Sequence, residues 1–65
     1  MKGKVKWYNT KQGYGFIEGE DGVDAFVHKS SLPFWTIFLS SGDVVEYTTK
    51  VSIKGLEATE IKTLQ

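Results

Sequence analysis

The chain has 65 residues, no cysteine, and 8 basic and 8 acidic residues that give a formal net charge of +0. This length predicts one domain with a small core, and the lack of cysteine excludes a disulfide framework and a thiolate metal site. The balanced charge argues against binding to duplex DNA by bulk electrostatic attraction.

The charges are unevenly distributed along the chain. Basic residues occupy the first sixteen positions without an acidic residue among them: Lys2, Lys4, Lys6 and Lys11. The acidic residues that follow are Glu18, Glu20, Asp21 and Asp24. No signal peptide pattern is present, and the longest apolar stretch, residues 32–39, is far shorter than the ~20 residues that span a bilayer. We therefore expect a soluble cytoplasmic protein without a membrane segment.

Short runs of β-branched and aromatic residues, separated by Gly, Asp, Ser or Asn, predict an all-β domain. The expected strands are residues 2–9, 14–18, 24–28, 44–53 and 58–63. Turns at 9–13 and at Asp21-Gly22 predict that the first three strands form a meander, and Lys54-Gly55 predicts the turn between the last two. The expected fold is a five-stranded antiparallel β-barrel.

Aromatic side chains are expected on one face of the second and third strands. Because side chains alternate across a strand, Tyr14 and Phe16 share a face, as do Phe26 and His28, if Ile17 points into the barrel. Val27 would then also point inward, and Trp7 and Tyr8 of the first strand would add to the exposed group. An exposed group of rings beside lysines suits single-stranded nucleic acid, because bases stack on the rings and lysines contact phosphates.

Two alternatives remain open for these rings. They could be cross-strand pairs that stabilise a hairpin, or the faces could be inverted so that the rings form the core. Gly13 and Gly15 favour outward rings, since glycine in a strand suggests close approach of another backbone or of a ligand. Val5 is expected in the core, and strict alternation places Trp7 on the same side of the strand. Exposure of Trp7 therefore requires a bend or bulge in the first strand.

Three segments carry a resemblance to a known family: KVKWYN (residues 4–9), GYGFI (13–17) and DAFVH (24–28). In order and separation they resemble the start of a cold-shock domain, whose paired ribonucleoprotein motifs the two latter segments match. The similarity returns at residues 42–47 and 54–58. This resemblance implies a five-stranded oligonucleotide-binding-fold barrel that binds single-stranded RNA or DNA, with a mild pyrimidine preference.

The resemblance also implies which residues form the binding surface, namely Lys6, Trp7, Tyr14, Phe16, Phe26 and His28. Asn9 and Asp24 match positions that shape or border it. Lys29 stands where bacterial members commonly have an aromatic residue, so a phosphate contact replaces a stacking contact there. Lys11 and Lys54 are further candidates for phosphate contacts.

Residues 32–39 differ most from the family pattern. Phe34, Trp35 or Phe38 could supply a stacking ring, the segment could pack over the barrel end, or it could form an interface for self-association. A strand-exchanged dimer is therefore an alternative to a monomer.

The leading hypothesis is a passive binder of single strands, an RNA chaperone that needs no cofactor. The alternative is an oligomerising or protein-interaction module that uses residues 32–39. An enzyme would need His28 with Asp24 or Ser30, and a single histidine on an open barrel face offers little to build a catalytic pocket. One histidine without cysteine cannot furnish a tetrahedral zinc site. We therefore expect neither catalysis nor a bound metal.

Overall fold

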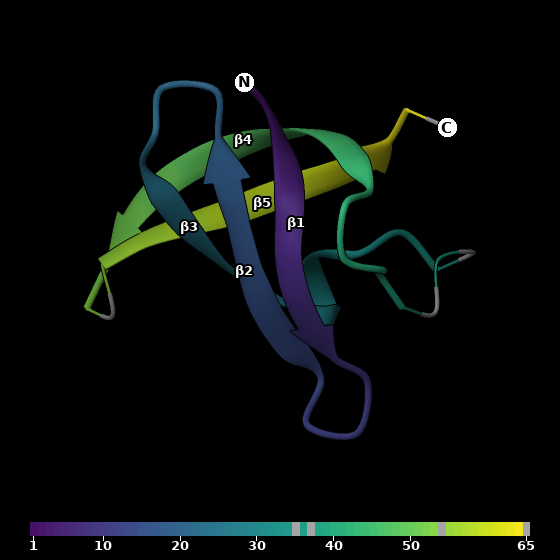
Figure 1. The fold of residues 1–65 in the computed structure, drawn as a ribbon. Helices are drawn as coiled ribbons and strands as arrows, with labels where there is room; N and C mark the ends of the chain where they lie inside the picture. Colours follow the sequence, from purple (N-terminus) through teal and green to yellow (C-terminus); the bar gives the residue numbers. More distant parts are fainter. Residues whose placement is uncertain (35, 37, 54, 65) are drawn as a thin grey trace.

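The chain folds into a small closed β-barrel (Figure 1). The computed structural model describes residues 1–34, 36, 38–53 and 55–64. The strands are β1 (Lys2–Asn9), β2 (Tyr14–Gly19), β3 (Asp24–His28), β4 (Val44–Ser52) and β5 (Gly55–Thr63), with one turn of 3₁₀ helix, η1 (Lys29–Ser31), after β3. The strand order around the barrel is β1-β2-β3-β5-β4. The prediction of an all-β, five-stranded barrel is confirmed.

The strand pairing follows the chain except where the barrel closes. β1 pairs antiparallel with β2 and β4, β2 with β3, and β4 with β5, while β3 and β5 pair in parallel. β5 begins at Gly55 rather than at the expected Ala58, because Gly55 already pairs with Ser52 at the hairpin end. Lys54, which was expected in this turn, lies outside the described residues.

Glycines make the two turns that connect the first three strands. Gly13 has a φ of 78° and its N–H donates to the Asn9 carbonyl oxygen at 2.7 Å. Gly22 has a φ of 83° and donates to the Gly19 carbonyl oxygen at 2.9 Å. Left-handed backbone of this kind favours glycine, because it has no Cβ to clash with the neighbouring carbonyl. The predicted meander of β1, β2 and β3 is therefore confirmed.

The core is formed by inward-facing residues of all five strands and one loop residue. Its buried members are Val5, Ile17, Ala25, Val27, Leu39, Val45, Tyr47, Ala58 and Ile61. Ile17 and Val27 are 0% exposed, as their alternation with the aromatic residues predicts. The inverted arrangement, in which the rings form the core, is thereby excluded.

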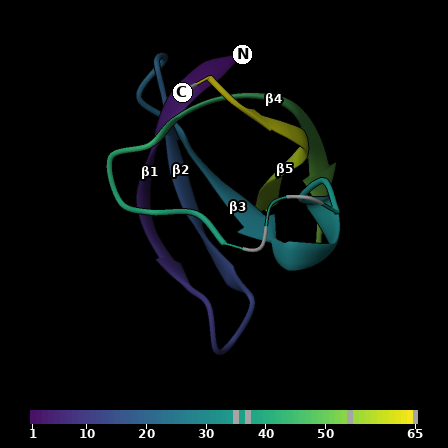
Figure 2. The ribbon, with the colours of Figure 1, turned by 90° about the vertical axis from the view of Figure 1, so that its right-hand side faces the viewer.

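The residues just before β4 lie beside β1 (Figure 2). The Val5 N–H donates to the Asp43 carbonyl oxygen at 2.9 Å, and the Gly42 N–H donates to the Val5 carbonyl oxygen at 2.8 Å. Leu39 of this segment is 3% exposed and packs in the core. In the part of the chain that the structure describes, no helix has the length and apolar character needed to cross a membrane.

Candidate nucleic-acid interface

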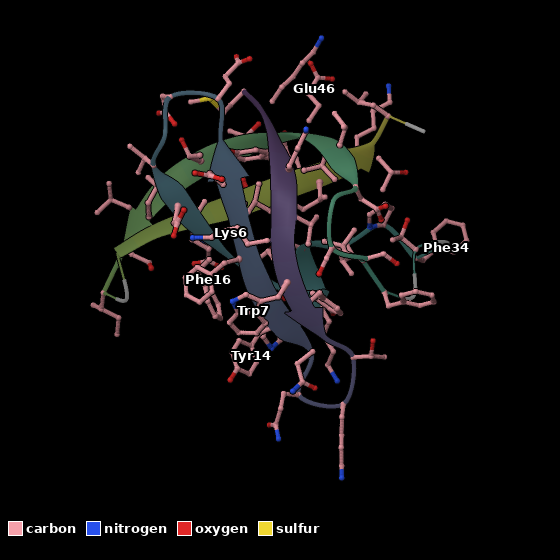
Figure 3. All side chains as sticks on the ribbon, viewed as in Figure 1. Lys6, Trp7, Tyr14, Phe16, Phe34 and Glu46 are labelled. Carbon is pink, nitrogen blue, oxygen red and sulfur yellow. The ribbon has the colours of Figure 1, made fainter. Side chains whose placement is uncertain are left out.

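Four aromatic rings contact one another on the outer face of β1, β2 and β3. We call Trp7, Tyr14, Phe16 and Phe26 the ring cluster; Figure 3 shows its three labelled members side by side. Phe16 and Phe26 are directly opposite each other in the β2–β3 register, with ring centroids 5.8 Å apart. Such ring pairs are worth about 0.5–1.5 kcal/mol beyond their buried area. The rings are therefore held in place before any ligand arrives.

The ring cluster is accessible to solvent although its members contact one another. Trp7 is 41% exposed, and Tyr14, Phe16, Phe26 and His28 are half-buried. The surface is thus an open apolar face, which is the environment on which bases can stack.

A bulge in β1 brings Trp7 to this face. Val5 is opposite Ile17 and Trp7 is opposite Phe16, so the extra residue between them, Lys6, has no partner of its own. Strict alternation would put Val5 and Trp7 on the same face. Because the bulge adds one residue, Val5 points into the core and Trp7 lies on the outer face. The Trp7 and Phe16 ring centroids are consequently 5.5 Å apart. The bulge or bend required from the sequence is confirmed.

Tyr8 was expected in the exposed group, and this expectation is wrong. It is opposite Gly15 in the register and packs against the hydrophobic core. The bulge comes before Tyr8, so alternation beyond it puts Trp7 outside and Tyr8 inside. Burial raises the pKa of the Tyr8 hydroxyl above its ordinary value.

Gly15 is required by the approach of β1 rather than by a ligand. A Cβ at Gly15 would collide with the Trp7 carbonyl oxygen and would lie 2.8 Å from the Tyr8 Cα. Of the two explanations that the sequence left open for this glycine, the close approach of another backbone is confirmed.

Lys6 is already engaged at one edge of the ring cluster. Its Nζ donates to Asp24 Oδ2 at 3.1 Å, and both side chains are 44% exposed. At this exposure an ion pair contributes about 0–1 kcal/mol, so a phosphate can displace the carboxylate at little cost. The structure therefore brings Lys6, expected on the binding surface, together with Asp24, expected at its border.

Asn9 has a structural role in the β1–β2 turn. Its Oδ1 accepts a hydrogen bond from the Gln12 N–H at 2.9 Å, which fixes the turn that carries Lys11. Lys11 itself is exposed. Asn9 thus acts on the interface by shaping the turn beside Tyr14, its register partner.

Ser30, a catalytic candidate from the sequence, instead positions His28. The Ser30 N–H donates to His28 Nδ1 at 3.2 Å, and the Ser30 Oγ lies 3.0 Å from the same nitrogen. Because Nδ1 accepts this N–H, the neutral imidazole has its proton on Nε2. A serine two residues after a histidine at a strand end is the sequence signal for this cap.

The described residues do not assemble the catalytic group that was considered. His28 and Ser30 are in contact, but Asp24 pairs with Lys6 and lies at the other end of β3. A base, a nucleophile and an orienting carboxylate therefore do not meet.

The apolar segment divides between core and surface. Leu39 is buried, and Leu32 packs against the core, whereas Phe34 and Phe38 are 92% and 54% exposed. Figure 3 shows Phe34 on the opposite side of β1 from the labelled rings, so the structure does not bring it to the ring cluster. Trp35, like Lys54, lies outside the described residues.

Comparison with known proteins agrees with this geometry. The family model described as 'Cold-shock' DNA-binding domain matches residues 1–64. A "Cold shock-like protein" of Thermotoga maritima is 43% identical over 68 aligned residues, covering 100% of both chains. "Cold shock protein 2" of Lactiplantibacillus plantarum is 43% identical over 63 residues, or 92% of each chain.

A similar domain also occurs inside a longer protein. "Protein lin-28 homolog A" of Xenopus tropicalis is 43% identical over 68 residues, which cover 91% of this chain and 35% of that protein. The match of the family model to nearly the whole sequence and the full-length similarity to bacterial relatives agree with the closed barrel and its exposed rings. The chain therefore belongs to the 'cold-shock' DNA-binding domain family and binds nucleic acid.

Proposed function

We propose that the chain binds unpaired RNA or DNA by stacking bases on the ring cluster and His28. In this proposal the phosphates contact Lys6, Lys11 and Lys29, and Lys54 is a further candidate for such a contact. The observation that supports it is the ring cluster itself, four mutually contacting aromatic rings left open to solvent on one face. Base stacking on such rings contributes about 1–3 kcal/mol per base.

The orientation of the rings favours an extended strand. Three of the four ring pairs are inclined to each other by 76°, 56° and 75°. Bases that stack on the two rings of such a pair are therefore not parallel and do not stack on each other as they do in a duplex strand. The expected activity is passive: the protein holds single strands open and disfavours hairpins, with no catalytic step.

A fluorescence titration tests the proposal directly. The chain has two tryptophans, so Trp35→Phe leaves Trp7 as the reporter inside the ring cluster. Adding an oligothymidine at low salt should quench Trp7 saturably at micromolar concentration, while a duplex of matched length should quench it far less. Absence of quenching by the single strand would contradict base stacking on this face.

The finer features of the partner are also proposals. The resemblance of residues 4–9, 13–17 and 24–28 to the family motifs supports a preference for pyrimidine-rich strands and action in the cytoplasm on RNA, as a monomer or a dimer. Titrations with oligothymidine, oligouridine and oligoadenine of equal length compare these ligands. Equal affinity for all three would contradict the pyrimidine preference.

The exposed phenylalanines support a second candidate function, self-association. Residues 30–42 contain no Asp, Glu, Lys or Arg, and Phe34 and Phe38 are 92% and 54% exposed within this stretch. An exposed apolar patch without charge is typical of an interaction surface. Sedimentation over a concentration series distinguishes the candidates. If the chain stays monomeric at all concentrations and still binds oligonucleotide, self-association is contradicted.

A further inference from the structure

The β2–β3 ladder continues one step beyond the ring cluster. Tyr14 is opposite His28, and the Lys29 N–H then donates to the Gly13 carbonyl oxygen at 2.8 Å. Gly13 precedes Tyr14 and Lys29 follows His28, so this pair lies next to the last ring of the cluster, at the end of the barrel that carries the β1–β2 turn.

The side chain of Lys29 lies over the backbone of Gly13. A Cβ built on Gly13 would be 2.8 Å from the Lys29 Cδ, 3.2 Å from its Cγ and 3.4 Å from its Cε. The whole stem of the lysine thus occupies the space that a side chain at position 13 would fill. Because packing already restricts the stem, Lys29 loses less conformational entropy than a solvated lysine when it binds a ligand.

The charge of Lys29 is available, whereas that of Lys6 is neutralised. Lys6 pairs with Asp24 at the other end of the face, where Glu18 is opposite Asp24 in the register. Within the described ranges, no carboxylate forms an ion pair with Lys29. At the Asp24 end each carboxylate has a lysine beside it: Lys6 pairs with Asp24, and Lys4 is opposite Glu18 in the register. That end is therefore close to neutral, whereas Lys29 gives the other end a positive charge.

We propose that Lys29, with its stem held over Gly13, forms a preorganised phosphate contact, and that the phosphodiester chain is held mainly at this end of the ring cluster. This inference rests on the proposed single-strand binding and adds which end of the ring cluster holds the phosphates. The phosphate bound by Lys29 belongs to the nucleotide whose base stacks on Tyr14 or His28. At the other end Lys6 contacts a phosphate only after it gives up its ion pair with Asp24.

Lys29→Met tests the contact, because methionine keeps an unbranched apolar stem for Gly13 and removes the ammonium. For single strands each neutralised phosphate contributes about 0.7 to the slope of log affinity against log salt, so the slope should become shallower by about 0.7. The ratio of wild-type affinity to Lys29→Met affinity for oligothymidine should therefore be about eightfold larger at about 50 mM salt than at about 1 M. Lys29→Arg should keep the wild-type slope.

The matched control is Lys62→Met, which makes the same change of charge on β5 at an exposed position outside the ring cluster. It should leave the slope unchanged. An equal loss in Lys62→Met, an unchanged slope in Lys29→Met, or a loss in Lys29→Arg as large as in Lys29→Met would each overturn the contact.

A single neutral methylphosphonate linkage, moved along an oligothymidine, locates the phosphate. One linkage should weaken binding to the wild-type chain severalfold and leave binding to Lys29→Met unaffected. Linkage effects that are identical in the two proteins would overturn the inference while single-strand binding stands. If no variant binds oligothymidine at all, the proposed function fails as well.

Discussion

Phe26 contacts two other members of the ring cluster from its position on β3. Its ring centroid lies 5.8 Å from that of Tyr14, in a stacked arrangement, and 5.8 Å from that of Phe16, edge to face. Its neighbours in β3, Ala25 and Val27, are fully buried. A single residue between two core positions therefore presents its side chain to the ligand while the backbone around it is anchored.

Phe26→Ala should weaken oligothymidine binding by about 1–3 kcal/mol and leave the barrel folded, because one stacking ring is lost and no core side chain changes. Phe16→Ala should have a similar effect. Fluorescence titration measures the affinity, and circular dichroism measures folding. Val51→Ala is the matched control: Val51 is 85% exposed on β4, outside the ring cluster, and its truncation should not affect binding. Unfolding of Phe26→Ala without a separable binding defect would contradict the outward role of this ring.

At the scale of the strands, β1 lies so close to β2 at Gly15 that no side chain fits there. The Trp7 carbonyl oxygen and the Tyr8 backbone occupy the space above the Gly15 Cα, and the bulge at Lys6 directly precedes them. The position of Trp7 on the face and the absence of a side chain at Gly15 therefore have one cause, the path of β1 across β2.

Gly15→Ala should lower the free energy of unfolding by about 3 kcal/mol or more, since the added methyl group collides with backbone that cannot move without shifting β1. Urea denaturation measures the loss. Gly22→Ala is the comparison: nothing lies within 4 Å of a Cβ there, and only its φ of 83° opposes the change. It should cost about 1 kcal/mol. A smaller loss in Gly15→Ala than in Gly22→Ala would show that the strands are not in close contact.

Strand positions and the core were predictable from the sequence because they follow local alternation. Val5, Ile17 and Val27 are inside as predicted, and the glycines at 13 and 22 make the expected turns. Alternation alone could not place Trp7 and Tyr8, because a one-residue bulge reverses the faces of everything after it and leaves no mark in the pattern. The contact between Lys29 and Gly13 joins residues that flank two paired strands and are distant in sequence, which no local pattern reveals.

For the molecule as a whole, Tyr47 links stability to pH. It is 3% exposed, and burial, followed by the charges of Asp21 and Glu20, raises the pKa of its hydroxyl above its ordinary value. Burial also raises the pKa of Tyr8. The folded chain thus holds these protons more strongly than the unfolded chain, whose tyrosines have a pKa of about 10. This contribution to stability is fully present below pH ~10 and is lost as pH rises through the raised values.

The urea midpoint should therefore fall more steeply above pH ~10 in the wild-type chain than in Tyr47→Phe, which has no phenolic proton at this position. Lysines that titrate in the same range act equally in both proteins, so the difference between the two curves isolates Tyr47. Parallel curves would contradict the raised pKa of this tyrosine.

The barrel closes where β3 and β5 run in parallel and, within the described residues, pair at Phe26 and Glu57. So short a ladder has few backbone hydrogen bonds, and we expect local opening of the barrel at this junction. Phe26 belongs both to this junction and to the ring cluster. If bases stack on Phe26 as proposed, a bound single strand should slow amide hydrogen exchange at the junction, because binding to the closed barrel adds to the free energy of local opening.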